Sequence, residues 1–200
     1  MDWFSMPPGF RGRPAWFVQL WWLVQATLFR GSPQFLYGWR RWLLRRFGAR
    51  IGAGVIIRPS VRVTYPWKLT IGDHAWIGDD VVLYTLGEIT IGAHAVVSQR
   101  SYLCTGNHDY TRPSFDIFAK PICVGEHAWL ATDVFVAPGV TVGAGTVVGA
   151  RSSVFRSLPG GVTAVGNPAH VVRERSVSEA HDAHGDQAVR GAAGAASDGV

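Results

Sequence analysis

Cysteine is scarce in this chain of 200 residues, which contains only Cys104 and Cys123. Two cysteines with no CxxC motif and no Cys/His cluster exclude a disulfide framework and provide no zinc motif. Reduced thiols are typical of the cytosol, so we expect a cytoplasmic protein. Charged residues are also few, at 16% of the chain against 48% hydrophobic residues. This composition is enough for a sizeable core and excludes disorder along the whole chain.

The sequence also lacks an apolar run long enough to span a bilayer. The segment Ala15–Phe29 is almost wholly apolar and is flanked by Arg11, Arg13 and Arg30, but it has only 15 residues. A spanning helix needs about 20. No small-x-small cleavage site follows the segment, which argues against a signal peptide.

The net charge of +5 is unevenly distributed along the chain. Residues 1–50 carry +7, residues 51–175 carry +1 and residues 176–200 carry −3. Six of the nine Trp residues also lie in 1–50. A basic, aromatic-rich segment is typical of contact with an anionic surface such as a lipid leaflet. Nucleic acid is the other anionic candidate, but no recognition motif accompanies the charge, so we expect no nucleic-acid partner.

A second helix is expected at Gln34–Phe47, directly after Pro33. At 100° per residue its Phe, Leu and Trp residues fall largely on one face, although Arg46 interrupts that stripe. The opposite face holds Arg40, Arg41 and Arg45. The pattern is typical of a helix that lies in a membrane interface. Packing of residues 1–50 against the main domain or a neighbouring subunit stays open as the alternative.

Residues 51–159 contain an internal repeat with a period of six, which is the dominant feature of the sequence. Fifteen positions at this spacing are all Ile, Leu or Val: Ile51, Ile57, Val63, Ile71, Ile77, Leu83, Ile91, Val97, Leu103, Val124, Leu130, Val136, Val142, Val148 and Val154. Gly often follows them, and a small residue or Val usually stands four positions on. Chance does not produce fifteen aliphatic residues in phase.

A period of six fits neither a long strand, with period 2, nor a helix, with period 3.6. It fits a short strand followed by a turn, and three such sides make a triangular coil of 18 residues. Inward aliphatic side chains would stack on their counterparts in the next coil, and parallel ladders would join the coils. Small residues would let the backbone turn the corners. The sequence therefore predicts a mainly β fold, a single-stranded parallel β-helix with an N-terminal helical extension.

The phase of the repeat is interrupted three times. Two residues are added at 69–70, two at 89–90, and 15 at Asp109–Cys123. Long insertions in a repeat array usually lie on the binding face. We therefore expect a β-helix domain at 51–175 with an inserted loop at 109–123. Residues 176–200 are polar, rich in Ala and Gly and without periodicity, so we expect a disordered tail.

The string SQRSYLCTGNHDYTRPSF (98–115), followed by KPICVGEHAWLA, APGVTVGAGTVVGARSSVFRSLP and VGNPAHVV, resembles the hexapeptide-repeat acetyltransferases. The resemblance covers about residues 30–175 and is closest to O-acetyltransferases of colanic acid and related exopolysaccharide synthesis. It implies a left-handed coil, a homotrimer with active sites in clefts between adjacent chains, and acetyl-CoA as co-substrate without a metal. The implied acceptor is a sugar hydroxyl of a lipid-linked precursor at the inner face of the cytoplasmic membrane.

The resemblance assigns His108, in the NHD motif, as the catalytic base. Direct acetyl transfer needs a base that takes the proton of the acceptor hydroxyl as it attacks the thioester, and histidine is suited to this task. Asn107 or Asp109 would orient the imidazole, and the sequence does not choose between them. Cys104 lies four residues earlier and is interpreted as a structural thiol rather than as a nucleophile.

The resemblance also implies the contacts of the thioester. The backbone amide of Thr132, beside Ala131, would stabilise the oxyanion of the tetrahedral state. Trp129 would line the cleft near the pantetheine, with simple packing at a coil edge as the alternative.

The phosphates of coenzyme A need cationic partners. The candidates are Arg156, Arg173 and Arg175, and the adenine would stack near Asn167 and Pro168. Phe155 stands where the family more often has Thr, and His170 stands where Lys or Arg is common. We therefore expect the phosphate contacts to be rearranged.

Acceptor-binding candidates lie on the preceding coil or in the insert: Asp79, Asp80, Tyr84, Tyr110 and Arg112. His74, His94 and His127 occupy equivalent positions in I-G-x-H-A-like blocks, and stacked coils would bring some of them close together. Exposed corner residues are a better interpretation of these histidines than a metal site.

Three alternative functions remain. The first is an acetyltransferase for a small molecule, such as an antibiotic or a free sugar. The second is a zinc hydratase like the γ-type carbonic anhydrases, which commonly have two His ligands five residues apart; here Ile122 stands five residues before His127, so the match fails. The third is a non-catalytic β-helix scaffold, which leaves the NHD and GNP motifs unexplained.

Overall fold

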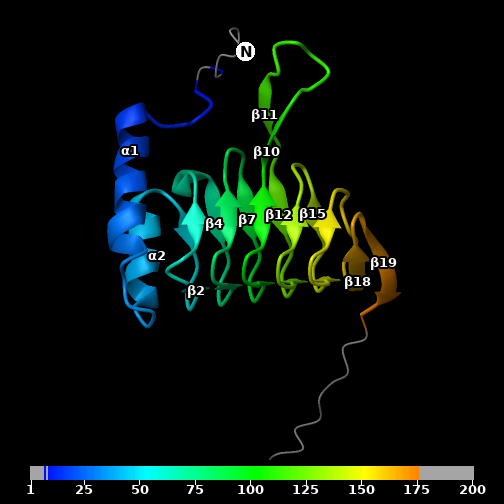
Figure 1. Ribbon diagram of the computed structural model, residues 1–200. Helices are drawn as coiled ribbons and strands as arrows, with labels where there is room; N and C mark the ends of the chain where they lie inside the picture. The colour runs from blue at the N-terminus through cyan, green and yellow to red at the C-terminus, as the bar shows by residue number, and fades with distance from the viewer. Residues whose placement is uncertain (1–6, 8, 176–200) are drawn as a thin grey trace, which may run out of the picture.

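The computed structural model describes residues 7 and 9–175. Their main body is a triangular prism of stacked coils, with two helices against its first coil and a hairpin arm standing out from one edge (Figure 1). The disordered tail expected at 176–200 lies outside the described residues.

Each side of the prism is one sheet, formed by successive coils. Sheet A has the order β1 (Arg50–Ile51), β4 (Leu69–Ile71), β7 (Ile89–Ile91), β12 (Ile122–Val124) and β15 (Thr141–Val142). Sheet B has the order β2 (Ile56–Ile57), β5 (Trp76–Ile77), β8 (Val96–Val97), β13 (Trp129–Leu130), β16 (Val147–Val148), β18 (Val162–Gly166) and β19 (Ala169–Glu174). Sheet C has the order β3 (Arg62–Val63), β6 (Val82–Tyr84), β9 (Tyr102–Cys104), β14 (Phe135–Val136) and β17 (Ser153–Val154). All neighbours pair in parallel except β18 and β19, which form a closing antiparallel hairpin.

The fifteen repeat positions form three internal columns, one behind each sheet. In sheet A, Ile51 pairs with Ile71, Ile71 with Ile91, Ile91 with Val124 and Val124 with Val142. The corresponding residues of sheets B and C pair in the same way. All fifteen side chains are at most 7% exposed. The predicted inward stacking of the aliphatic residues is therefore confirmed.

The residues added at 69–70 and 89–90 lengthen the strands of sheet A. Leu69 pairs with Ile89, and Ile89 pairs with Ile122, so the three side chains make an additional buried layer. The insertion expected at Asp109–Cys123 consequently ends earlier, because Ile122 and Cys123 already belong to β12. It also begins earlier, since β10 (Gly106–His108) and β11 (Ile117–Ala119) form a separate antiparallel hairpin.

The glycines after the repeat positions are needed for close approach between coils. A Cβ on Gly72 would lie 2.5 Å from the backbone nitrogen of Ala93, and one on Gly92 would lie 2.5 Å from that of Glu126. Several turns instead place non-glycine residues at positive φ, among them His74 and Asp80 at 56°. Glycine therefore supplies space at these corners, whereas the left-handed turn positions are often filled by His, Asp and Arg.

The N-terminal extension consists of α1 (Ala15–Val24), a π-helix at Gln25–Phe29 and α2 (Tyr37–Arg46). A short 3-10 helix at Pro66–Lys68 lies within the prism. The helix expected at Gln34–Phe47 begins later, at Tyr37. The guanidinium of Arg40 explains the delay, because it donates to the carbonyl oxygens of Pro33 (2.9 Å) and Gln34 (2.6 Å) and holds them outside the helix.

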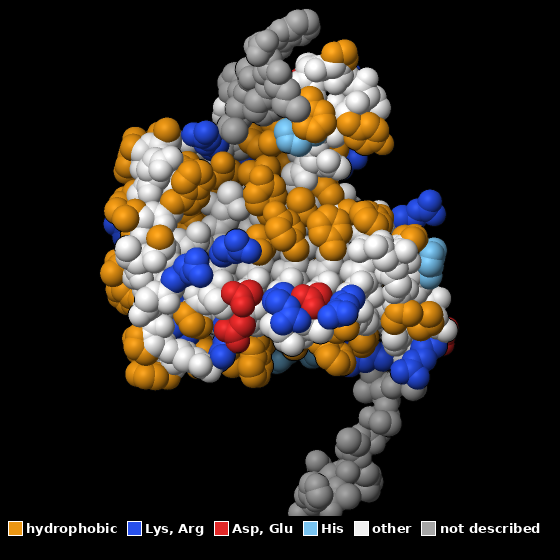
Figure 2. Space-filling model, viewed as in Figure 1, with side chains coloured by type: hydrophobic (Ala, Val, Ile, Leu, Met, Phe, Trp, Pro, Cys, Tyr) orange, Lys and Arg blue, Asp and Glu red, His pale blue; other side chains and the backbone are white. Residues whose placement is uncertain are grey.

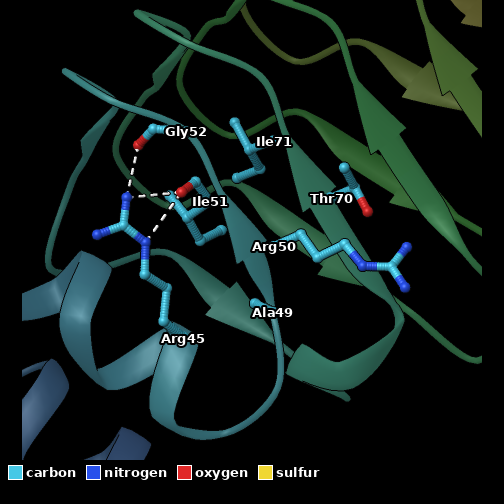
Figure 3. Close-up of a pocket in the computed structure, with 7 residues that line it drawn as sticks. All are labelled: Arg45, Ala49, Arg50, Ile51, Gly52, Thr70 and Ile71. Atoms are coloured by element: carbon cyan, nitrogen blue, oxygen red, sulfur yellow. Dashed lines mark hydrogen bonds between the residues drawn. The ribbon is translucent and has the colours of Figure 1, made fainter.

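The helices protect the open edge of the first coil. Its carbonyls would otherwise lack partners, and each sheet receives one donor: Trp21 to Val63 in sheet C (2.8 Å), Arg40 to Ile57 in sheet B (2.6 Å), and Arg45 to Ile51 in sheet A (2.9 Å). Figure 3 shows Arg45 donating to the carbonyls of Ile51 and Gly52 beside a shallow pocket of sheet A. Covering an edge in this way prevents further strand pairing.

These contacts correct the predicted basic face of the second helix at Arg40, and the predicted apolar face is divided between buried and exposed residues. Arg40 is fully buried against the prism with Leu43 and Leu44, whereas Trp39 and Trp42 are exposed. The need of the first coil for hydrogen-bond donors decides the orientation, and a hydrophobic pattern does not register that need. Among the described residues, no helix has the length and apolar character required to cross a membrane.

Candidate active site

The predicted base lies on an arm, the name we give to residues 106–119, which leaves the prism at the corner between sheets C and A (Figure 1). In the arm His108 lies opposite Ile117 in the β10–β11 pair. Glycine suits the first position of the arm, because a Cβ on Gly106 would lie 2.6 Å from Cδ1 of Leu86. The β-hairpin thus places the histidine outside the prism but on a paired strand.

The side chain of His108 is held by Phe115. Nδ1 of His108 lies 2.9 Å from the carbonyl oxygen of Phe115, and the two rings stack with centroids 4.3 Å apart at 10°. A carbonyl oxygen can only accept, so Nδ1 carries the hydrogen, and in the neutral imidazole the lone pair is then on Nε2. This is the tautomer that a general base requires. The sequence analysis missed Phe115, because only the closed hairpin brings its carbonyl back to the histidine.

The other predicted residues of the arm surround this contact. Oδ1 of Asn107 accepts a hydrogen bond from the backbone amide of His108 (2.8 Å). Asp109 accepts from the hydroxyl and amide of Thr111, which lowers the pKa of Asp109, and it pairs with Arg112 at 3.2 Å. Tyr110 is exposed near the tip. Whether Asn107 or Asp109 orients the imidazole remains a prediction.

The residues predicted to contact the thioester, Trp129, Ala131 and Thr132, lie at another corner of the prism, between sheets B and C. Asp79, Gln99, Thr132 and Ala150 occupy equivalent turn positions there, and within residues 7 and 9–175 none of their backbone amides has an acceptor. The corner therefore presents a column of N–H donors about 4.8 Å apart, the spacing of paired strands. Such donors are suited to an oxyanion. The four amides of the column are equivalent in geometry. Thr132 is distinguished from the others by its position three residues after Trp129.

A pocket of about 670 Å³ lies next to this column, with Trp129, Trp76 and Val96 as apolar walls. Nε1 of Trp129 donates to Oγ of Ser98 at 2.9 Å, which fixes the indole across the pocket. Asp79 also lines the pocket. Its carboxylate accepts from Arg58 at 2.9 Å and from Ser60 at 3.1 Å. Apolar walls with a few fixed polar groups are typical of small-molecule sites. Asp80 follows in the same turn, and Ala131 lies between Trp129 and Thr132.

The candidates for the nucleotide end of coenzyme A gather at the last coils. A pocket of about 280 Å³ is lined by Phe155, Arg156, Pro168, Ala169 and His170. The Asn167–Pro168 peptide is cis, and Arg173 lies on β19 opposite Thr163.

Arg175 has a structural position instead. Its guanidinium donates to the carbonyls of Gly145 (2.8 Å) and His127 (3.2 Å) at the corner between sheets A and B. Of the three arginine candidates, Arg156 lines the pocket at the last coils, whereas Arg175 binds backbone carbonyls at another corner.

Tyr84 lies on the outer face of sheet C at the start of the arm, where a Cβ on Gly106 would lie 3.2 Å from Cε1 of its ring. Its ring begins an aromatic column that continues through Tyr102, Phe135 and Phe155 with centroids 6.0, 6.1 and 5.8 Å apart. Figure 2 shows a band of hydrophobic side chains across this side of the molecule, above a row of charged residues. Burial raises the pKa of Tyr84. Tyr84 is thus part of an apolar face rather than of the pocket beside Asp79.

Two further groups named from the sequence have non-catalytic surroundings. Burial raises the pKa of the Cys104 thiol, which donates to the Gly106 carbonyl at 3.2 Å, and a raised pKa disfavours the nucleophilic thiolate. His74, His94 and His127 stack on one another with centroids 5.3 and 4.9 Å apart. In the described part of the chain no group of three His, Cys, Asp or Glu side chains could hold a metal ion.

The predicted site residues therefore occupy opposite borders of sheet C within one chain. The arm, with His108, leaves the corner after sheet C, and the column with Thr132 lies at the corner before it. About six residues separate the corners, which at ~3.3 Å each is on the order of 20 Å. One chain brings His108, the predicted base, together with Asn107, Asp109, Tyr110 and Arg112 on the arm, but not with the predicted thioester contacts.

Comparison with known proteins agrees with this architecture. The chain is 69% identical over 176 residues to the putative colanic acid biosynthesis acetyltransferase WcaF of Escherichia coli K12, covering 88% of this chain and 97% of that protein. It is 28% identical over 145 residues to the galactoside O-acetyltransferase of the same organism, covering 71% of each. A hexapeptide-repeat acetyltransferase of Vibrio cholerae, solved with acetyl coenzyme A, has a TM-score of 0.72 and 26% identity over 84% of this chain and 88% of that one. No family model matches the chain.

The triangular prism of parallel coils with a protruding hairpin is a β-solenoid, consistent with the left-handed β-helix of hexapeptide-repeat acyltransferases. The chain belongs to the hexapeptide-repeat acetyltransferases, and is an acetyl-CoA-dependent enzyme of that family.

Proposed function

We propose that the chain transfers the acetyl group of acetyl-CoA to a sugar hydroxyl of an exopolysaccharide precursor, with His108 as general base. The observation that carries the mechanism is the hydrogen bond from Nδ1 of His108 to the Phe115 carbonyl, which leaves the lone pair on Nε2. The acceptor class is supported by the 69% identity to a protein named for colanic acid biosynthesis.

The transfer needs no covalent enzyme intermediate. Nε2 of His108 takes the proton of the sugar hydroxyl while the hydroxyl oxygen bonds to the thioester carbonyl carbon. The amide of Thr132 donates to the carbonyl oxygen as it becomes negative. When the carbon–sulfur bond breaks, the His108 imidazolium returns the proton to the leaving thiolate. The products are the O-acetyl sugar and coenzyme A, and the imidazole is again neutral.

We propose a homotrimer in which the arm of one chain meets the Thr132 corner of the next. The roughly 20 Å between the two groups within one chain, and the partly exposed aromatic column on sheet C between them, support this arrangement. Three copies with sheet C toward a threefold axis would form a closed ring with three equivalent clefts. Trp129 and Arg156 would then bind the pantetheine and a phosphate, while Asp79 and the arm residues would hold the sugar.

The protein would act in the cytoplasm, where acetyl-CoA is available. Its two cysteines are both unpaired, which agrees with a reducing compartment.

Replacement of the base tests the chemistry. We expect His108→Ala to lower the rate of acetyl transfer by about 10²–10⁴-fold, with acetyl-CoA binding retained. His94→Asn is the matched control, because it removes an imidazole at the corner of sheets A and B and keeps a residue that tolerates positive φ. A nearly normal rate in His108→Ala would refute the role of base. The rate of acetyl transfer should also be compared between lipid-linked saccharides, free saccharides and small molecules. A higher rate with a small soluble molecule would support the alternative acceptor.

Complementation between variants tests the shared site. His108→Ala removes the base, and Trp129→Glu places a charge in the pocket at the other corner. Mixed trimers of the two inactive variants would contain clefts in which both contributing surfaces are intact. Activity that appears only on co-expression supports a site between chains, whereas lasting inactivity of mixed trimers contradicts it.

A further inference from the structure

The outer surface of α1 carries a stripe of large apolar side chains. Trp16, Leu20 and Leu23 are 67%, 42% and 62% exposed, and they follow one another at helical spacing. The opposite side of the helix, with Val18 and Trp21, is fully buried against the prism. The stripe is therefore not needed for the packing of α1, and it points away from the β-helix.

A second apolar stripe continues this surface onto α2. Nε1 of Trp39 donates to the carbonyl of Leu28 at 3.0 Å, which joins the π-helix after α1 to α2. The rings of Trp39 and Trp42 stack with centroids 5.1 Å apart at 18°. Leu28, Trp39 and Trp42 are all exposed, as is Phe35 in the connecting turn. Figure 2 shows hydrophobic side chains along the outer border of the molecule where the helices lie.

Positive charge accompanies these stripes without any acidic residue. No Asp or Glu occurs between residues 3 and 72, a stretch that contains eleven Lys and Arg. Some of these cations are used inside the fold, such as Arg40 and Arg45. Others are exposed, including Arg30 in the connection and Arg46, which lies one helical turn beyond Trp42.

We propose that this surface, formed by the exposed Trp, Leu and Phe side chains of α1, α2 and their connection with Arg13, Arg30 and Arg46, docks on an anionic lipid bilayer. Indole rings favour the headgroup level and leucines the upper acyl region, and guanidinium groups pair with lipid phosphates. A helix with a buried inner face and an apolar outer face needs such a second environment.

A second copy of the chain fits this surface less well. A twofold contact would place the patch against itself, so the exposed arginines of both copies would meet with no carboxylate between them. An anionic bilayer supplies the missing negative charge and also accepts the leucines. Docking here would hold the acetylation site next to a lipid-linked acceptor, but the proposal does not depend on the enzyme's acceptor.

Vesicle sedimentation with the full chain tests the proposal, without acetyl-CoA or any saccharide present. We expect binding to vesicles of equal parts phosphatidylcholine and phosphatidylglycerol, at least tenfold weaker binding to phosphatidylcholine alone, and weakening by added salt. Trp16→Ser with Leu23→Ser, and separately Arg30→Glu with Arg46→Glu, should each lower the binding constant at least tenfold.

The matched control is Val172→Ser with Arg151→Glu, two exposed residues on the last coils whose change should leave vesicle binding unaltered. Circular dichroism confirms that each variant is folded. Equal binding of both vesicle types, or equal loss in the control, overturns the proposal. So does a patch variant that changes the oligomeric state but not vesicle binding, or a stronger affinity for RNA than for anionic vesicles.

Discussion

Apart from the closing hairpin of β18 and β19, the prism and the arm are both built from strands of two or three residues, yet they are stabilised in different ways. In the prism, interior strands pair on both sides, and their inward side chains are at most 7% exposed. In the arm, two strands pair only with each other, and their side chains are half-buried or exposed. The prism therefore supplies stability, and the arm supplies a histidine whose position depends on few contacts. If His108 is the base, as we propose, residues of the arm can change at little cost to the stability of the fold.

The largest expected difference between the prism and the arm is in how much a truncated side chain lowers the free energy of unfolding. Leu103 is fully buried in the column of sheet C, so Leu103→Ala should lower the free energy of unfolding by about 2–5 kcal/mol. Ile117 in the arm is only half-buried, and Ile117→Ala should cost less than about 1 kcal/mol. Urea denaturation of both variants measures the contrast. Equal losses would mean that the arm is part of the cooperative core.

A smaller loss of stability is expected when a Cβ is added between the backbones of two neighbouring coils. Gly92→Ala would place a Cβ 2.5 Å from the backbone nitrogen of Glu126, and backbone cannot move aside easily. We expect a loss of about 1–3 kcal/mol. Gly149→Ala is the matched control, since its Cβ would meet Cγ1 of Val165, a side-chain atom that can rotate away. Equal losses of the two variants in thermal melts would mean that contact between the backbones of neighbouring coils does not decide the cost.

The periodic part of the fold could be predicted because every coil repeats the same requirement. An aliphatic side chain at Ile71, Ile91 or Val124 is needed for the same reason, and phase alone identifies it. The sequence analysis does not predict the additional buried layer of Leu69, Ile89 and Ile122. These residues are also aliphatic, but they lie where the six-residue phase is interrupted. The aliphatic character of Leu69, Ile89 and Ile122 is the sequence signal that indicates this layer.

Neither end of the chain nor the arm repeats, and here sequence reasoning was weaker. Arg40 was assigned to a polar surface, yet it is buried because the last carbonyl of β2 needs a donor. Phe115 was not selected, because its backbone carbonyl, rather than its side chain, is what Nδ1 of His108 contacts. Every residue has a backbone carbonyl, so a contact made by a carbonyl across a closed hairpin cannot be predicted from residue type.

The arm's dependence on few contacts can be tested through activity. Phe115→Ala removes the ring stacked on His108 but keeps the carbonyl, so we expect kcat to fall about fivefold while the KM for acetyl-CoA and the melting temperature change little. Phe118→Ala is the matched control, because Phe118 belongs to the same hairpin and contacts Lys120 instead. A fall in kcat that is equal in both variants would point to general loosening of the arm rather than to the ring at His108.

The smallest expected effect concerns an ion pair on the prism. A hydrogen bond from Arg100 to Asp133 (2.7 Å) is the main cause that lowers the pKa of Asp133. A lowered pKa in the folded state means that the pair stabilises above the unfolded value of about 3.9, and that this contribution is lost as the pH falls through the folded-state value. Because the pair is at the surface, the contribution is small and is screened by salt.

Asp133→Asn should therefore be less stable than the wild type at neutral pH, and the difference should close as the pH is lowered to about 3 or below. Urea denaturation at several pH values measures it, and Arg100→Gln with the double variant completes a cycle that isolates the pair. A difference that stays constant with pH would show that the carboxylate acts through shape rather than charge. In that case the stability of this corner would depend on its backbone ladder alone, as in the rest of the prism.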